Sequence, residues 1–125
     1  MLDRAVQRAL QLHQRGQLQE AATAYGRVLA ADPEHAEANH LLGLLLHPAG
    51  RHAEAAALIG KSARRVPQNP VYHSNLGVVL KELNRLDAAV ESYRLALRLD
   101  PELAQVHSNL GVALLGLGRA EEAVA

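Results

Sequence analysis

Histidine offers the widest choice of chemistry in this sequence, because its side chain can bind a metal or transfer a proton near neutral pH. The 125 residues include seven histidines and no cysteine. His40 and His47 fall on one expected helix, where a rise of about 1.5 Å per residue separates them by roughly 10 Å. That distance is too large for two ligands of one ion. The histidine spacing therefore predicts no metal site.

Nucleophilic catalysis has equally little support. The candidate nucleophiles are serine and threonine hydroxyls, and none is spaced with a histidine and a carboxylate as an activated nucleophile requires. The glycines do not form a phosphate-binding motif. We therefore expect no enzyme activity, no catalytic residue and no cofactor in this chain.

Two asparagines have a spacing that suits ligand binding. The hexapeptide HSNLGV occupies residues 73–78 and again residues 107–112, and 107 − 73 = 34, so Asn75 and Asn109 lie 34 residues apart. A side-chain amide carries both a donor and an acceptor, so it can pair with the backbone of an extended peptide of any sequence. Two solvated surface asparagines would give the same pattern, and the sequence leaves both interpretations open.

The 34-residue spacing extends well beyond these asparagines, which indicates internal repeats. Five columns of residues keep it without an insertion. The columns are Pro33, Pro67 and Pro101; Leu42, Leu76 and Leu110; Gly43, Gly77 and Gly111; Ala21, Ala55, Ala89 and Ala123; and Gly16, Gly50 and Gly118, with Asn84 in the remaining place.

Each period contains two stretches with the apolar spacing i, i+3, i+4 and i+7 of an amphipathic helix. The turn between them needs a left-handed residue, so Asn84 should have a positive φ like the glycines of its column. Pro48 should shorten its helix, and Asn69 should cap the helix that Pro70 opens. We expect first helices over residues 3–15, 36–48, 70–83 and 104–117, and second helices over 18–31, 52–65, 86–99 and from 120 onward.

The columns match a known motif, W-x2-L-G-x2-Y, then A-x3-F, then P. The third period carries His73, Leu76, Gly77, Leu80, Ala89, Tyr93 and Pro101 in those places. The chain thus resembles a tetratricopeptide repeat (TPR) protein, with repeats similar to those of O-linked N-acetylglucosamine transferases. The resemblance implies a single all-α domain over residues 1–125, a right-handed α-solenoid of stacked antiparallel helix hairpins. Its units would be 2–35, 36–69, 70–103 and a truncated 104–125.

The resemblance also implies a peptide-binding surface. In TPR proteins the first helices of the units line a concave groove, and the positions that face it lack any concentration of charge here. We therefore expect a protein or an extended peptide as the partner. In this sequence, the residues at the family's groove-facing positions are His40, Leu41, Leu44, Ser74, Asn75, Val78, Lys81, Ser108, Asn109 and Val112.

The composition argues against other partners. Lys plus Arg and Asp plus Glu each number 13, so the net charge is zero and there is no long-range attraction to phosphates. The longest apolar run, residues 41–46, is too short to span a bilayer, and the first residues do not form a signal-peptide pattern. We expect no nucleic-acid partner, no membrane partner and a cytoplasmic location.

A peptide-binding scaffold is therefore the leading functional prediction, and two alternatives stay open. The chain could recruit substrates for a TPR-containing glycosyltransferase whose catalytic domain lies downstream. It could instead self-associate through its C-terminal end. By the repeat, the last second helix should run to about residue 133 (99 + 34), whereas the sequence stops at Ala125 and would leave apolar surface uncovered.

Overall fold

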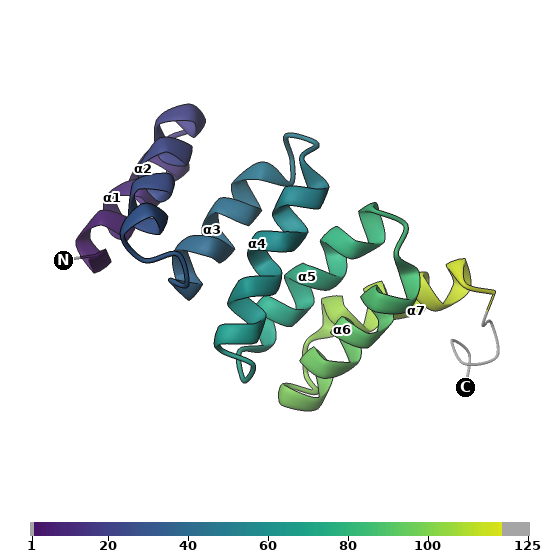
Figure 1. Ribbon diagram of the computed structural model, residues 1–125. Coiled ribbons are helices and arrows are strands. Elements are labelled where there is room, and N and C mark those ends of the chain that lie inside the picture. The colour runs from purple at the N-terminus through teal and green to yellow at the C-terminus, as the bar shows by residue number, and fades with distance from the viewer. Residues whose placement is uncertain (1, 119–125) are drawn as a thin grey trace. The chain divides into compact units, whose positions relative to one another are not determined.

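The computed structural model describes residues 2–118, and this part of the chain is all-α, as predicted. It divides into two compact units between Val66 and Pro67, with α1 to α4 in the first and α5 to α7 in the second (Figure 1). No strand occurs in residues 2–118. The helices are α1 (Leu2–Gln14), α2 (Leu18–Ala31), α3 (Ala36–Leu46), α4 (His52–Arg65), α5 (Pro70–Glu82), α6 (Leu86–Leu99) and α7 (Ala104–Gly116).

The helix bounds follow the predicted map closely. All three described second helices begin and end where the repeat places them, and Asn69 caps α5 by accepting a hydrogen bond from the Val71 amide. α3 ends at Leu46, two residues earlier than predicted, because Pro48 has no N–H to donate to the helix. The helix expected from residue 120, with Ala123 and the end of the fourth unit, lies outside the described residues.

The turn inside each hairpin has the same geometry. Asn84 has a φ of 59°, which confirms the predicted left-handed conformation, and the glycines of its column lie between 75° and 84°. In each turn an amide beyond this residue donates to a carbonyl five residues earlier, the pattern of a Schellman helix end. These bonds are Gln17 N to Leu12 O (3.0 Å), Arg51 N to Leu46 O (3.2 Å) and Arg85 N to Leu80 O (2.9 Å).

Two hairpins close through a glycine that faces a large buried side chain. A Cβ atom added at Gly77 would lie 2.5 Å from Cε1 of Tyr93, and one at Gly43 would lie 2.6 Å from Cγ1 of Ile59. Tyr93 and Ile59 are both fully buried. The glycine of this column therefore allows the close approach of the paired helices in α3–α4 and α5–α6.

The first hairpin, α1–α2, departs from the motif and still forms. Its glycine position holds Ala9, which is fully buried along with Tyr25 of α2. The Tyr25 hydroxyl lies 3.2 Å from Nδ1 of His13, and the two rings meet edge to face. One methyl group in place of hydrogen is thus accommodated in this hairpin.

A second set of periodic hydrogen bonds joins each loop to the helix that follows it. Nδ2 of Asn39 donates to the carbonyl of Pro33 at 3.0 Å. His73 and His107, one and two repeats later, place Nε2 at 2.8 Å and 2.9 Å from the carbonyls of Pro67 and Pro101. A carbonyl only accepts, so both imidazoles carry a proton on Nε2. The first motif position, usually aromatic, therefore serves here as a donor to the loop.

Replacing Gly77 with leucine should destabilise the protein by about 1–3 kcal/mol or more, because the side chain would overlap Tyr93. Gly26 is the matched control, since it is also helical and a Cβ there meets nothing within 4 Å. Gly26→Leu should stabilise α2 by about 0.5–1 kcal/mol through helix propensity alone. Urea unfolding of both variants would measure the difference. Equal stability of the two variants would contradict the packing described.

The Tyr93 hydroxyl is buried and has no hydrogen-bond partner among the described residues. In the α1–α2 hairpin the equivalent Tyr25 pairs with His13, and the residue equivalent to His13 here is Lys81. Lys81→His should therefore supply the missing partner and stabilise the second unit by about 0.5–1.5 kcal/mol. Thermal unfolding would measure the gain, and Lys81→Leu, which supplies no partner, should not reproduce it.

His40 is 7% exposed, because α3 packs against both α1 and α2. Burial lowers the pKa of its imidazole to about 4. The unfolded chain, with a histidine pKa of about 6.5, binds the proton more readily, so stability is highest above pH 6.5 and falls as the pH drops towards 4. Between pH 7 and pH 5 the loss from this group should be about 1–2 kcal/mol. In His40→Val, the free energy of unfolding should fall by that much less between pH 7 and pH 5. The same fall in His40→Val as in the wild type would rule out a buried neutral imidazole.

Candidate functional site

The ten predicted groove residues fall into two sets, one in each compact unit. α3 carries His40, Leu41 and Leu44 in the first unit. The other seven lie on α5 and α7, two helices of the second unit that contact each other. We call these seven residues the α5–α7 face: Ser74, Asn75, Val78, Lys81, Ser108, Asn109 and Val112.

Exposed apolar side chains gather on and beside the α5–α7 face. Val112 is 50% exposed, and Val71 and Leu115 are 47% and 57% exposed. Val71 and Leu115 were absent from the predicted set, although each occupies a repeat position that TPR proteins turn towards the groove. Apolar surface of this kind loses contact with water when a ligand covers it, which favours binding.

The amides on this face are partly engaged. Asn75 and Asn109 are half-buried, and Nε2 of Gln105 donates to Oδ1 of Asn109 at 3.1 Å. The Nδ2 group of Asn109 could donate to a ligand carbonyl, and Oδ1 keeps a second lone pair for a ligand N–H. The Ser74 hydroxyl donates to the carbonyl of Val71 at 3.1 Å within its own helix. Lys81 is the one charged residue among the seven.

The three residues on α3 offer less surface. His40 is buried, so the prediction of an accessible side chain at this position is not supported. Leu41 is partly buried and packs against the core cluster of Val6, Val28 and Ala38. Leu44 is half-buried. Packing of α3 against α1 and α2 covers positions that are more open on α5 and α7.

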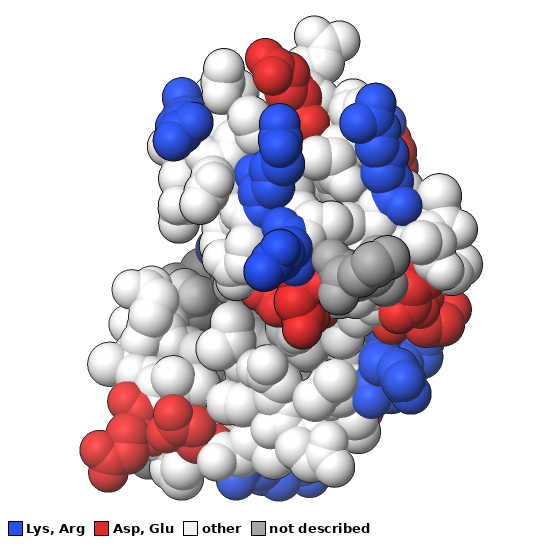
Figure 2. Space-filling view, turned by 90° about the vertical axis from the view of Figure 1, so that its left-hand side faces the viewer, with Lys and Arg blue, Asp and Glu red and all other residues white. Residues whose placement is uncertain are grey.

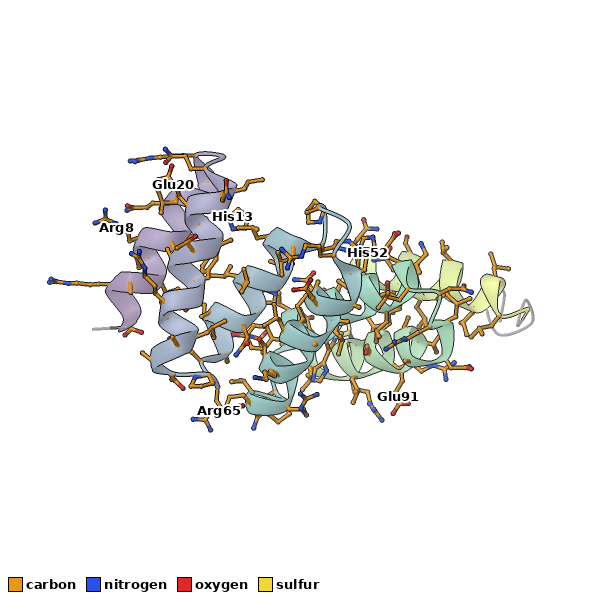
Figure 3. All side chains as sticks on the ribbon, turned by 45° about the horizontal axis from the view of Figure 1, so that its top comes forward. Arg8, His13, Glu20, His52, Arg65 and Glu91 are labelled. Atoms are coloured by element: carbon orange, nitrogen blue, oxygen red, sulfur yellow. The ribbon has the colours of Figure 1, made fainter. Side chains whose placement is uncertain are left out.

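Two clefts in the first unit are lined by none of the seven residues of the α5–α7 face. A cleft of about 760 Å³ opens on the outer side of α1–α2 beside Arg8, Leu12 and Glu20, and one of about 420 Å³ lies beside Leu42, Leu46 and Glu54. Leu42, Leu46 and Glu54 occupy the same repeat positions as Arg8, Leu12 and Glu20, 34 residues later. Arg8 stands where the second repeat has Leu42, which makes the outer cleft the more polar of the two (Figure 3).

Charge is evenly mixed on the surface near this outer cleft. Figure 2 shows basic and acidic side chains interspersed over the side of the molecule where α1 and α2 lie. In the first unit, Arg51 and Glu54 form a two-bond ion pair at 2.7 Å and 2.8 Å. Such a surface has no single sign of charge that would attract nucleic acid or an anionic lipid.

The structure also brings together two histidines that the sequence did not pair. Nδ1 of His47 and Nδ1 of His52 lie 2.9 Å apart across the turn between α3 and α4, with ring centroids separated by 4.8 Å. Within residues 2–118 no group of three or more potential metal ligands occurs. Helical spacing could not reveal this pair, because His47 lies just after α3 and His52 begins α4. Their positions on either side of a tight turn were the available signal.

None of the helices in residues 2–118 has both the length and the apolar character needed to cross a membrane.

Comparisons with known proteins agree with this geometry. The family described as Tetratricopeptide repeat matches residues 6–70, and the family described as TPR repeat matches residues 79–118. No curated protein matches the sequence.

Several solved structures resemble the chain. A MamA mutant is 30% identical with a TM-score of 0.88, over 98% of this chain and 72% of that one. Another crystal structure of MamA is 22% identical with a TM-score of 0.88, over 93% of this chain and 68% of that one, a likeness of fold alone. A mutant of the Thermobaculum terrenum O-GlcNAc transferase is 34% identical with a TM-score of 0.82, over 90% of this chain and 22% of that one.

One family match covers more than half of the chain. Two of the described hairpins carry the motif's glycine contact, and all three have its left-handed turn residue. The chain therefore belongs to the tetratricopeptide repeat family and has its all-α, helical-repeat solenoid fold.

Proposed function

We propose that this chain is a scaffold that binds an extended, weakly charged peptide on the α5–α7 face. The observation that carries the proposal is the exposure of Val71, Val112 and Leu115 beside the amides of Asn75 and Asn109. Membership of the TPR family supports a role in protein interaction. The choice of an extended peptide rests on the chemistry of the face.

Apolar burial and amide pairing have separate tasks in this mechanism. Covering the exposed valine and leucine side chains supplies the driving force, at about 25 cal/mol per Å² of apolar surface removed from water. The peptide's own carbonyl and N–H groups then need partners, because a buried unpaired polar group costs about 1–3 kcal/mol. Asn75 and Asn109 provide such partners without selecting a particular side chain of the peptide.

In the first unit, considered by itself, we propose Leu41 and Leu44 as contacts for a peptide. Both keep some exposed surface, whereas His40 does not. Lys81 adds one positive charge to the α5–α7 face, which is too little for an interface dominated by ion pairs. Affinity should therefore depend only weakly on salt.

Changing Asn75 and Asn109 together to alanine should weaken peptide binding about tenfold or more, since each lost hydrogen bond is worth about 0.5–1.5 kcal/mol. The peptide is first selected from a random library displayed against the whole chain. It is then titrated calorimetrically into the wild type and the double variant at two salt concentrations. The control changes Gln11 and Gln19, two exposed residues on α1 and α2, to alanine and so removes as many amides elsewhere.

Two results would contradict this mechanism. The first is equal affinity for the wild type and the Asn75/Asn109 variant, or an equal loss in the glutamine control. The second is affinity that collapses at moderate salt, which would indicate recognition by charge. Circular dichroism of both variants separates a binding defect from a folding defect.

A second candidate function is suggested by the 34% identity with part of an O-GlcNAc transferase. In that case the same face would present protein substrates to a catalytic domain in the same polypeptide. The chain spans 22% of that transferase, so the whole enzyme's activity does not transfer to it directly. The coding sequence that surrounds the chain in its genome would test this candidate.

Self-association is a third candidate, favoured by the exposure of Leu115 near the end of α7. Sedimentation at rising protein concentration would test it. A monomer at all concentrations would remove this candidate without affecting the peptide proposal, because the two use different readouts.

A further inference from the structure

We propose that His47 and His52 together bind one divalent transition-metal ion, of the Cu(II) or Ni(II) type, at the turn between α3 and α4. The two Nδ1 atoms face each other at 2.9 Å, and both side chains are half-buried. Neutral imidazole nitrogen is a common ligand for these ions.

The separation of the two nitrogens allows both of them to bind one ion. A histidine nitrogen lies about 2.0–2.1 Å from a bound metal, so two such bonds at a right angle span about 2.9 Å between nitrogens. The tetrahedral angle preferred by zinc would span about 3.3 Å. The observed 2.9 Å is also the length of the N–H···N hydrogen bond of the metal-free pair, and a shift of a few tenths of an ångström reaches either span. The choice of Cu(II) or Ni(II) rests instead on the high affinity of imidazole ligands for these two ions.

The turn holds the two ligands in place before any ion arrives. His47 follows the last residue of α3, and His52 is the first residue of α4. Gly50 has a φ of 84°, its amide donates to the His47 carbonyl at 3.0 Å, and the Arg51 amide donates to Leu46 O at 3.2 Å. Ligands fixed by backbone hydrogen bonds lose little conformational entropy on binding.

The surrounding charges leave room for a cation. Arg51 precedes His52 in the sequence, and its guanidinium donates to both carboxylate oxygens of Glu54, which neutralises its positive charge. No third protein ligand accompanies the pair within residues 2–118, so water or an added ligand would fill the other positions. Such a site exchanges its ion readily.

The proton balance is simple when both imidazoles are neutral. Without metal, one Nδ1–H donates to the other Nδ1. With metal, that proton moves to Nε2 of the same ring, and both Nδ1 lone pairs face the ion. No proton is released to solvent when the metal binds. The metal therefore competes only with the N–H···N hydrogen bond between the two rings.

The other five histidines have different partners or surroundings. His13 pairs with Tyr25, His35 accepts a hydrogen bond from the Ala38 amide, and His40 is buried. The remaining two bond to proline carbonyls through Nε2. His47 and His52 are therefore the described histidines whose rings face each other.

Ni(II) titrated calorimetrically into the whole chain at neutral pH, with glycine as a weak competitor, should bind at one ion per chain. His47→Gln and His52→Gln should each weaken binding by about tenfold or more. The control is His107→Asn, because Asn39 already makes the equivalent proline-carbonyl bond, and it should leave affinity unchanged. Cu(II) bound to the wild type should give an electron paramagnetic resonance spectrum with two nitrogen ligands, and one nitrogen in either glutamine variant.

The site is overturned if Ni(II) binds equally well to the wild type and the two glutamine variants. It is also overturned if the stoichiometry exceeds one ion per chain or if His107→Asn weakens binding to the same extent. Loss of thermal stability in the glutamine variants without any Ni(II) binding by the wild type would assign the pair to a hydrogen bond only.

Discussion

The close approach of two helices at one small residue is the constraint on which each hairpin depends. Where α5 crosses α6, the hydrogen of Gly77 is the largest group that the Tyr93 ring leaves room for. This contact sets the helix separation, and the separation determines which other side chains meet. Ala9 shows the tolerance of the arrangement, because with alanine in this column the opposing tyrosine, Tyr25, pairs with His13 through its hydroxyl.

The sequence predicted the helices because its signals are local and repeated. Pro48, Asn69 and Asn84 each act through the conformation of a few neighbouring backbone atoms. Their effects on α3, α5 and the turn between α5 and α6 could therefore be predicted residue by residue. The side-chain bonds from Asn39, His73 and His107 were not predicted. These residues occupy the repeat position where the family usually has an aromatic residue. Only the folded structure shows that their polar atoms reach the proline carbonyls.

The candidate site was harder to predict, because exposure depends on tertiary packing. Repeat position alone treats His40 and Ser74 as equivalent, yet α3 packs against two earlier helices and its histidine is buried. Val71 and Leu115 lie at groove positions that the predicted set omitted, although that set contains apolar residues such as Val112; their exposure is what draws attention to them. The His47–His52 pair was not predicted for another reason. Helical periodicity compares residues within one helix, whereas these two face each other across a turn.

The hydrogen bonds that recur every 34 residues have a consequence for how this sequence can change over time. A proline carbonyl, its partner six residues later and the left-handed turn residue must keep their spacing within each hairpin. Inserting or deleting a single residue between them would break several bonds at once, whereas copying a complete repeat would break none. Duplication of whole repeats is thus the change in length that the fold tolerates best, and two identical HSNLGV segments at the repeat distance are what such a duplication leaves behind.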